Sequence, residues 1–158
     1  MGEIIKGIDL KVYSPLKGKL IMLSDVDDEV FATKALGDGV AIIPEIGEVY
    51  APFSGKVESI FTTGHAISIK SETGADLLIH IGVNTVELDG QGFECFVTEG
   101  DLIEKGQFLI RFDIEYIKSK GLDTVTSLVV PNHTKFKEIE YEKSQNVEVG
   151  QLIMKIES

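Results

Sequence analysis

Two histidines, His65 and His80, offer the clearest chemistry in the sequence because they lie in two neighbouring segments that can pair. Residues 65–70 (HAISIK) alternate apolar and polar side chains, which is typical of a strand with one buried face. Residues 75–81 (ADLLIHI) are apolar on both faces, as in a central strand, and the turn-like residues 71–74 (SETG) join the two. A four-residue loop there would pair His65 with His80. The sequence therefore predicts two imidazoles as direct cross-strand neighbours, with Cβ atoms about 4.5–5.5 Å apart.

A pair of adjacent histidines supports three interpretations, which the residues alone leave open. Both could be core histidines bonded to backbone groups, although two charged imidazoles side by side would be costly. They could bind zinc, but zinc sites use three or four protein ligands, and the other candidates are only His133 and Cys95, which lies on another predicted strand. Finally, one histidine could be a nucleophile while the other stabilises the transferred group. That chemistry needs a neutral ring nitrogen and an N–H donor, and no third ligand.

The elements that must position these histidines are short strands punctuated by glycines. Two segments, 28–35 and 114–120, predict short helices. Because there is no linker and no change in composition, we expect one all-β domain, an antiparallel β-sandwich or barrel with very short helices. The predicted strands are 18–23, 40–44, 49–52, 56–61, 65–70, 75–81, 92–98, 107–112, 124–130 and 152–156.

Two short patterns occur twice in the chain. Residues 14–20 (SPLKGKL) resemble residues 51–57 (APFSGKV), and residues 100–110 (GDLIEKGQFLI) resemble residues 147–153 (VEVGQLI). The interval between copies is not constant, so the chain is not a solenoid. We interpret the copies as one hairpin-and-turn unit that is used twice to close a sandwich or barrel.

Composition excludes several classes of function. The 158 residues include 15 lysines and arginines against 26 aspartates and glutamates, a net charge of −11, and Arg111 is the only arginine. Such a chain is a poor partner for nucleic acid or for an anionic membrane surface. One cysteine excludes an internal disulfide and a multi-cysteine metal site. Neither a signal peptide nor a transmembrane segment is apparent, so we expect a cytoplasmic protein.

The stretch 80–93 (HIGVNTVELDGQGF) carries the most specific resemblance to a known family. With residues 37–42 (GDGVAI), residues 63–69 (TGHAISI) and the interval of fifteen between the two histidines, it resembles the glucose-type enzyme IIA proteins of the bacterial phosphoenolpyruvate-dependent sugar phosphotransferase system. The resemblance implies a short N-terminal segment, 1–13, followed by a single enzyme IIA domain, 14–158. It also implies a β-sandwich built from a duplicated motif, in agreement with the repeats.

The resemblance implies roles for four residues. His80 matches the histidine that accepts a phosphoryl group on Nε2 from the phosphocarrier protein HPr, and His65 matches the second histidine, which donates a hydrogen bond to that group. Thr63 would orient His65 through its hydroxyl, and the backbone carbonyl of Gly82 would fix the tautomer of His80. Phosphoryl transfer needs mainly positioning and dispersal of charge. We therefore expect no metal and no cofactor at this site.

Partners of this family dock on a shallow apolar surface around the histidines. Asp28 matches an aspartate at its edge that would attract basic groups on HPr, which suits the acidic net charge. Asn84 replaces an aspartate of some members, and Glu29 stands where an apolar residue can lie. From periodicity alone, the apolar residues would instead be core. The positions that match the apolar surface are Val30, Phe31, Ala35, Leu36, Phe61, Leu78 and Val86.

The leading hypothesis is a phosphocarrier that takes a phosphoryl group from phospho-HPr onto His80 and passes it to a cysteine of an enzyme IIB domain during sugar uptake. A second hypothesis is a regulatory binding module whose phosphorylation state controls permeases, kinases or transcription. A third is a zinc hydrolase on a related scaffold. Two other residues look structural: we expect Cys95, between Phe93 and Val97 on one strand face, to be a buried free thiol, and His133 to lie in a surface loop.

Overall fold

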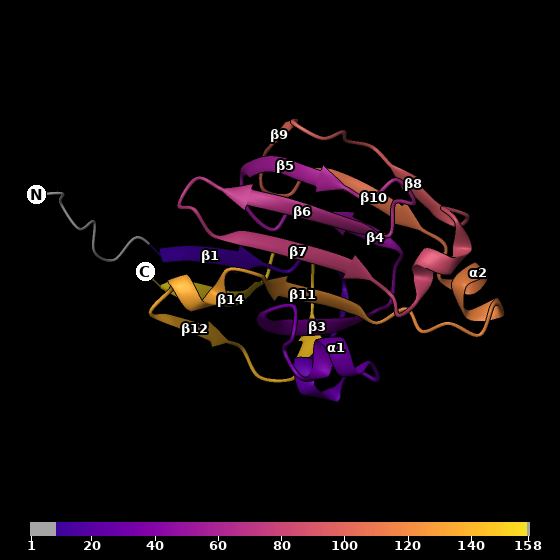
Figure 1. Cartoon of the computed structure of the whole chain (residues 1–158), viewed down its shortest axis with the longest axis horizontal. Helices are drawn as coiled ribbons and strands as arrows, with labels where there is room; N and C mark the ends of the chain where they lie inside the picture. Colours follow the sequence, from indigo (N-terminus) through magenta and orange to yellow (C-terminus); the bar gives the residue numbers. More distant parts are fainter. Residues whose placement is uncertain (1–8, 158) are drawn as a thin grey trace, which may run out of the picture.

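The computed structural model describes residues 9–157 and shows an antiparallel β-sandwich with short helices, which confirms the predicted fold class (Figure 1). Residues 1–8 and residue 158 lie outside the described residues. The expectation that the chain begins without a signal peptide therefore falls mostly on residues that the structure does not describe. None of the described helices is long and apolar enough to span a membrane. The strands are β1 (Asp9–Tyr13), β2 (Gly18–Met22), β3 (Asp38–Pro44), β4 (Glu48–Tyr50), β5 (Gly55–Ile60), β6 (Ala66–Ser71), β7 (Asp76–Ile81), β8 (Phe93–Cys95), β9 (Leu102–Ile103), β10 (Phe108–Phe112), β11 (Thr126–Val130), β12 (Glu138–Tyr141), β13 (Gln145–Val147) and β14 (Leu152–Glu157). The helices are η1 (Leu23–Asp25), α1 (Glu29–Ala32), η2 (Thr85–Leu88), α2 (Ile114–Ser119) and η3 (His133–Lys135).

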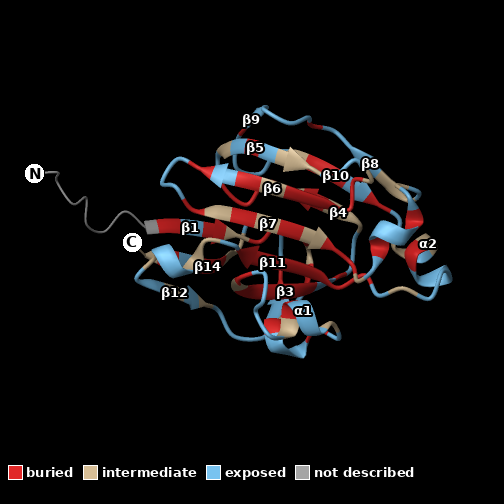
Figure 2. Ribbon diagram, viewed as in Figure 1, coloured by how far each residue is buried: buried red, intermediate tan, exposed pale blue. Residues whose placement is uncertain are grey.

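One large sheet and two small sheets enclose the core. The large sheet has the strand order β13-β2-β3-β11-β7-β6-β5-β9, and the small sheets have the orders β1-β14-β12 and β4-β10-β8. Fully buried aliphatic side chains such as Ile67, Ile79 and Leu128 point inward from the large sheet, and the buried residues in Figure 2 follow its central strands. A second, smaller apolar cluster, which includes Phe31 and Val129, lies on the opposite face of this sheet beside η1 and α1.

The two copies of the first pattern, which begin at residues 14 and 51, form turns that are hydrogen-bonded to each other. Each of these turns is also bonded to one copy of the second pattern, at equivalent positions. A backbone group in one copy has its counterpart at the corresponding position of the other copy, so the two copies are related by an approximate twofold arrangement. The interpretation of the repeats as one structural unit used twice is therefore supported by geometry. The matching N–H to carbonyl bonds are Tyr13 to Pro52 (3.0 Å), Tyr50 to Pro15 (2.9 Å), Ser14 to Gln151 (2.7 Å) and Ala51 to Gln107 (2.8 Å).

Each predicted strand overlaps an observed one, but β1, β9, β12 and β13 were not predicted. β12 (EIEY) alternates exposed glutamates with half-buried apolar residues, but four residues are too few for this alternation to stand out in the sequence. β1 lies within the segment expected to precede the domain, and it pairs along β14. The predicted helix 28–35 is shorter in the structure because Lys34 adopts a left-handed conformation (φ 62°), which ends α1.

Candidate active site

His65 and His80 lie side by side, with ring centroids 5.0 Å apart and ring planes at 78°. His80 is on β7 near the middle of the large sheet, and His65 comes directly before β6. The predicted neighbourhood of the two imidazoles is therefore present. The route by which the chain brings them together differs from the one predicted.

The predicted pairing of His65 with His80 is wrong by one residue. Ala66 is the cross-strand partner of His80, and Lys70 pairs with Asp76. The His65 carbonyl instead accepts a hydrogen bond from the next residue after His80, at 2.7 Å. The ring of His65 thus reaches His80 from the end of β6, where the strand alternation no longer fixes the side-chain direction.

The turn between β6 and β7 explains the shift in register. The N–H of Ser71 donates to the carbonyl of Ala75 (2.9 Å), so the loop has three residues, 72–74, where four were predicted. Gly74 has φ 96°, the left-handed conformation that a three-residue hairpin loop requires at one position. Glycine adopts it without a steric penalty, and the shorter loop moves every pair by one residue.

His80 is held by a hydrogen bond from its Nδ1 to the carbonyl of Gly82 (2.9 Å). A carbonyl only accepts, so Nδ1 carries the proton and Nε2 keeps its lone pair in the neutral ring. Gly82 has φ 78°, and a Cβ there would lie 2.4 Å from Cγ2 of Thr85 and 2.7 Å from the carbonyl oxygen of Asp123. Only glycine fits this position, and its N–H bonds to the carbonyl of Val125 (2.9 Å).

His65 is held by the hydroxyl of Thr63, whose Oγ1 lies 2.5 Å from Nδ1. The imidazole of His65 is buried, with 2% of the residue exposed. Phe61 packs edge-on against it, with ring centroids 5.1 Å apart. On the other side of the pair, the ring of Phe31 lies 5.0 Å from that of His80. The two imidazoles thus lie in a row between two phenylalanine rings.

This apolar surrounding keeps both imidazoles uncharged near neutral pH. Burial, together with the neighbouring His80, lowers the pKa of His65 to about 4. Burial also lowers the pKa of His80, although its bond to Gly82 and the negative charge of Asp28 act in the opposite direction. A neutral imidazole is the form that can act as a nucleophile.

Two residues at the site were missed by sequence reasoning. Ser127 on β11 is the cross-strand partner of His80 on the side away from Ala66, and it is almost fully buried. Thr85 is fully buried and donates its hydroxyl to the carbonyl of Ile81. In the sequence, Ser127 is noticeable only as a serine within a run of apolar strand residues. Its place at the site becomes clear only once its pairing with His80 is known.

Most positions of the expected docking surface are exposed in the structure. Four of its large apolar side chains are exposed, namely Val30, Leu36, Phe61 and Val86. Ala35 is also exposed, and Leu78 is half-buried. Phe31 is a correction, because it is 4% exposed and packs inward with the cluster beside His80. Asp28 begins α1 by accepting a hydrogen bond from the N–H of Val30 (2.9 Å).

The expectation of a buried thiol at Cys95 is wrong, since this residue is exposed. β8 ends at Cys95 and lies at the edge of its small sheet, where one side of the strand has no neighbouring strand. His133 lies in η3 and is half-buried. A cleft of about 600 Å³ beside Arg111 and Glu94 includes neither His65 nor His80. The histidine site is thus set on a surface rather than in that cleft.

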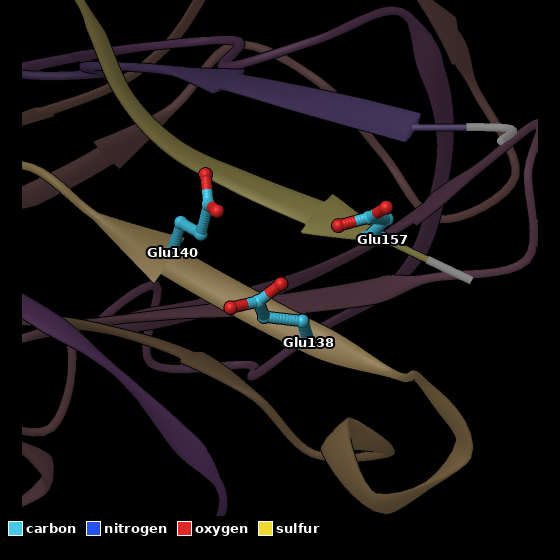
Figure 3. Close-up of side chains that lie close together, drawn as sticks. All are labelled: Glu138, Glu140 and Glu157. Atoms are coloured by element: carbon cyan, nitrogen blue, oxygen red, sulfur yellow. The ribbon is translucent and has the colours of Figure 1, made fainter.

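Side chains that are close enough to share a metal ion lie elsewhere in the described part of the chain. Within residues 9–157, the one group of three or more acidic, histidine or cysteine side chains close enough to share an ion is Glu138, Glu140 and Glu157, with carboxylate oxygens within 4.8 Å of one another (Figure 3). Exposed carboxylates of this kind are common without an ion, and Lys155 lies directly opposite Glu140. The histidine pair is not part of such a group. Among the described residues, no third side chain lies close enough to complete the three protein ligands that a catalytic zinc site usually has.

Comparison with known proteins places the chain in a family. The family described as phosphoenolpyruvate-dependent sugar phosphotransferase system, EIIA 1, matches residues 10–136. The glucose-specific EIIA component of Staphylococcus epidermidis is 43% identical over 143 residues, which are 90% of this chain and 86% of that protein. The glucose-specific EIICBA component of Staphylococcus saprophyticus is 44% identical over 154 residues, 98% of this chain, but this chain spans only 23% of that longer protein.

A solved structure agrees with these sequence matches. Glucose permease IIA from Mycoplasma capricolum superimposes with a TM-score of 0.87 at 36% sequence identity, over 93% of this chain and 95% of the other. The match in sequence covers both histidines, and the match in structure covers nearly the whole sandwich. The chain therefore belongs to the EIIA 1 family of the phosphoenolpyruvate-dependent sugar phosphotransferase system.

Proposed function

We propose that this chain is a cytoplasmic phosphocarrier that accepts a phosphoryl group from phospho-HPr on Nε2 of His80 and passes it to a cysteine of an enzyme IIB domain. The observation that carries the proposal is the bond from Nδ1 of His80 to the Gly82 carbonyl (2.9 Å). It leaves Nε2 as the free nucleophilic nitrogen of a neutral ring. His80 is only partly buried, so a docked partner can reach it.

The transfer is a displacement at phosphorus. The lone pair of His80 Nε2 forms a new N–P bond while the N–P bond of the donor phosphohistidine breaks, and the donor imidazole leaves with that electron pair. In the second transfer, a thiolate of the acceptor forms an S–P bond, and the imidazole of His80 regains its lone pair. Such reactions depend mainly on in-line positioning and on stabilising the phosphoryl oxygens.

His65 supplies the stabilising donor in this proposal. If the hydroxyl of Thr63 donates to Nδ1 of His65, the proton of the neutral ring is on Nε2, from which it can be donated to a phosphoryl oxygen. The 2.5 Å between Oγ1 of Thr63 and Nδ1 of His65 places the two groups in hydrogen-bond contact, which the assigned direction requires. Because His65 is buried, its hydrogen bond to an anion is stronger than the same bond would be in water.

The surface around the histidines suits brief docking of partners. Val30, Leu36, Phe61 and Val86 form its exposed apolar part. Asp28 contributes negative charge near His80, and the whole chain has a net charge of −11. A basic partner would be steered toward such a protein, which raises the rate of encounter.

Labelling with phosphoenolpyruvate that carries a radioactive phosphoryl group, in the presence of enzyme I and HPr, tests the proposal. We expect the wild-type chain to take up label and to lose it when an enzyme IIB domain is added. The His80→Gln variant should remain unlabelled, whereas the matched control His133→Gln should be labelled like the wild type. Undiminished labelling of His80→Gln would remove His80 from its assigned role.

A further inference from the structure

The segment that carries part of the docking surface is anchored differently at its two ends. It runs between β2 and β3 and contains η1 and α1. In its first part, Leu23, Val26 and Phe31 are buried against the outer face of the large sheet. In its last part, residues 33–36 are all exposed. Apolar packing therefore fixes the beginning of the segment and leaves its end without buried side chains.

A polar contact takes over at that end. Lys34 forms an ion pair with Asp38, with 2.9 Å between Nζ and Oδ1. Tyr141 donates its hydroxyl to the other carboxylate oxygen of Asp38, although the two residues are 103 positions apart in the sequence. The backbone N–H of Gly39 also donates to Oδ1 of Asp38 (2.9 Å). We refer to Lys34, Asp38 and Tyr141 together as the Asp38 clip.

The clip is partly shielded from solvent, which strengthens its charged hydrogen bonds. Burial alone would raise the pKa of Asp38, but the bonds from Tyr141 and Lys34 lower it below its ordinary value. Burial and the neighbouring carboxylate raise the pKa of Tyr141. Lys34 also lies over the ring of Tyr141, 5.8 Å from its centroid. A carboxylate that remains charged and accepts several donors is a firm anchor.

The clip acts on Lys34, in the turn that directly follows α1. Lys34 has φ 62°, a conformation that costs free energy in a residue with a side chain, so its surroundings must hold it. Its N–H bonds to the carbonyl of Phe31 (2.9 Å), and the next residue bonds to Val30 (3.1 Å). Any shift of Lys34 is thus passed directly to the turn that presents Val30 and packs Phe31 on His80.

We propose that Tyr141 is a positioning residue for the docking surface: through Asp38 and Lys34 it holds the end of α1 in the orientation that partners meet. The proposal rests on the proposed function, because it assigns a purpose to the surface beside His80. Tyr141 is on β12, which belongs to a small sheet, and it lies outside the residues that the family match covers. The clip therefore ties the docking surface to a part of the chain remote in sequence.

Two tyrosine-to-phenylalanine variants test this inference. Tyr141→Phe removes only the hydroxyl of the clip. Tyr116→Phe is the matched control. Tyr116 is on α2, and its hydroxyl donates a hydrogen bond to the side chain of Gln91 (2.6 Å), outside the clip. The measurement is the rate of phosphoryl transfer from phospho-HPr at increasing donor concentration. Loss of a hydrogen bond to a charged group should raise KM about fivefold in Tyr141→Phe, with kcat and final labelling unchanged, while Tyr116→Phe behaves like the wild type.

A second measurement separates positioning from general stability. Because Phe31 packs on His80, the NMR signals of the His80 ring should shift in Tyr141→Phe and remain in place in Tyr116→Phe. A lower melting temperature of Tyr141→Phe with unchanged KM and unchanged His80 signals would overturn the inference. Should the wild-type chain itself remain unlabelled, the proposed function fails, and the His80 signals of the two variants still decide whether the clip positions α1.

Discussion

His65 and His80 lie between two phenylalanine rings, whereas Glu138, Glu140 and Glu157 gather where β12 and β14 meet solvent. Both regions bring titratable side chains from different strands within a few ångströms of one another. In the histidine region, each imidazole has one ring nitrogen fixed by a hydrogen bond. In the glutamate region, the carboxylates have no such bonds among the described residues. The two regions thus differ in whether each titratable side chain has a hydrogen-bond partner that fixes its orientation, and not in how close the side chains lie.

Burial is the second difference between the two regions. His65 is almost inaccessible, and the pKa values of both histidines are lowered by burial. A lowered pKa is a change in the free energy of protonation that the fold imposes on a particular group. Glu138 and Glu140 are exposed on the surface, where water solvates their charges. This contrast implies that changes at the histidines affect phosphoryl transfer and that changes at the glutamates do not.

The largest effect is expected from His65→Gln, which removes the second imidazole and keeps His80. We expect phosphorylation of His80 to survive and onward transfer to an enzyme IIB domain to slow by about 100- to 1000-fold, the usual effect of removing one preorganised donor. Rapid-quench measurement of each half-reaction separates the two rates. An equal loss in both half-reactions would contradict this division of roles between the histidines.

The sequence was sufficient to predict that the two imidazoles are neighbours and that His80 lies on a strand, whereas His65 lies just before β6 and not on it. The alternation of apolar and polar residues and the glycines at the ends of strands are local features of the sequence, so they can be recognised without a structure. The exact pairing of β6 with β7 could not be predicted, because it depends on whether Gly74 allows a three-residue loop. The exposure of Cys95 depends on the position of β8 at the edge of a sheet, which is a property of the assembled fold.

Contacts between residues far apart in the sequence were also out of reach. The bond from Tyr141 to Asp38 and the pairing of Ser127 with His80 arise only when distant strands come together. Phe31 was expected on the exposed surface because the family resemblance gives its position in the alignment but not the direction of its side chain. Local pattern thus predicts which residues form the site, and the tertiary structure decides which of them face a partner.

A pH titration of stability is expected to give the next largest effect. Below pH 6.5 the unfolded chain binds a proton at residue 65, while the folded chain resists it until pH 4 or so, because the folded-state pKa of His65 is about 4. As pH falls through this window, the wild-type chain should lose roughly 3 kcal/mol of unfolding free energy that His65→Gln does not lose. Urea unfolding at several pH values measures the difference.

Two other groups help to interpret that titration. The pKa of His80 is also lowered, and His80 titrates in both proteins, so the comparison reports residue 65 together with its coupling to His80. The lowered pKa of Asp38 makes that carboxylate lose its stabilising effect only at still lower pH, below its ordinary value of 3.8. Parallel stability curves for the wild type and His65→Gln between pH 6.5 and 4 would show that His65 is not kept neutral by the fold.

Thr63→Val tests the orientation of His65 with a smaller expected effect. Valine keeps the shape of the side chain and removes the hydroxyl next to Nδ1 of His65. Loss of a partner that orients a functional imidazole should slow transfer to enzyme IIB by about tenfold. Thr62→Val, the exposed neighbouring threonine, is the matched control. Equal rates for the two variants would show that Thr63 has no orienting role.

The smallest effect is expected in the glutamate region. Glu138 and Glu157 are direct cross-strand partners, so their like charges oppose pairing of β12 with β14. Glu138→Lys should convert the pair into an attractive one and raise the unfolding free energy by about 0.5 kcal/mol, without a change in phosphoryl transfer. Because mutual repulsion in water is all that these carboxylates are expected to contribute, calcium or magnesium should leave the melting temperature of the wild type unchanged. A rise in that temperature with either ion, lost in Glu138→Lys, would show that this region is a site after all.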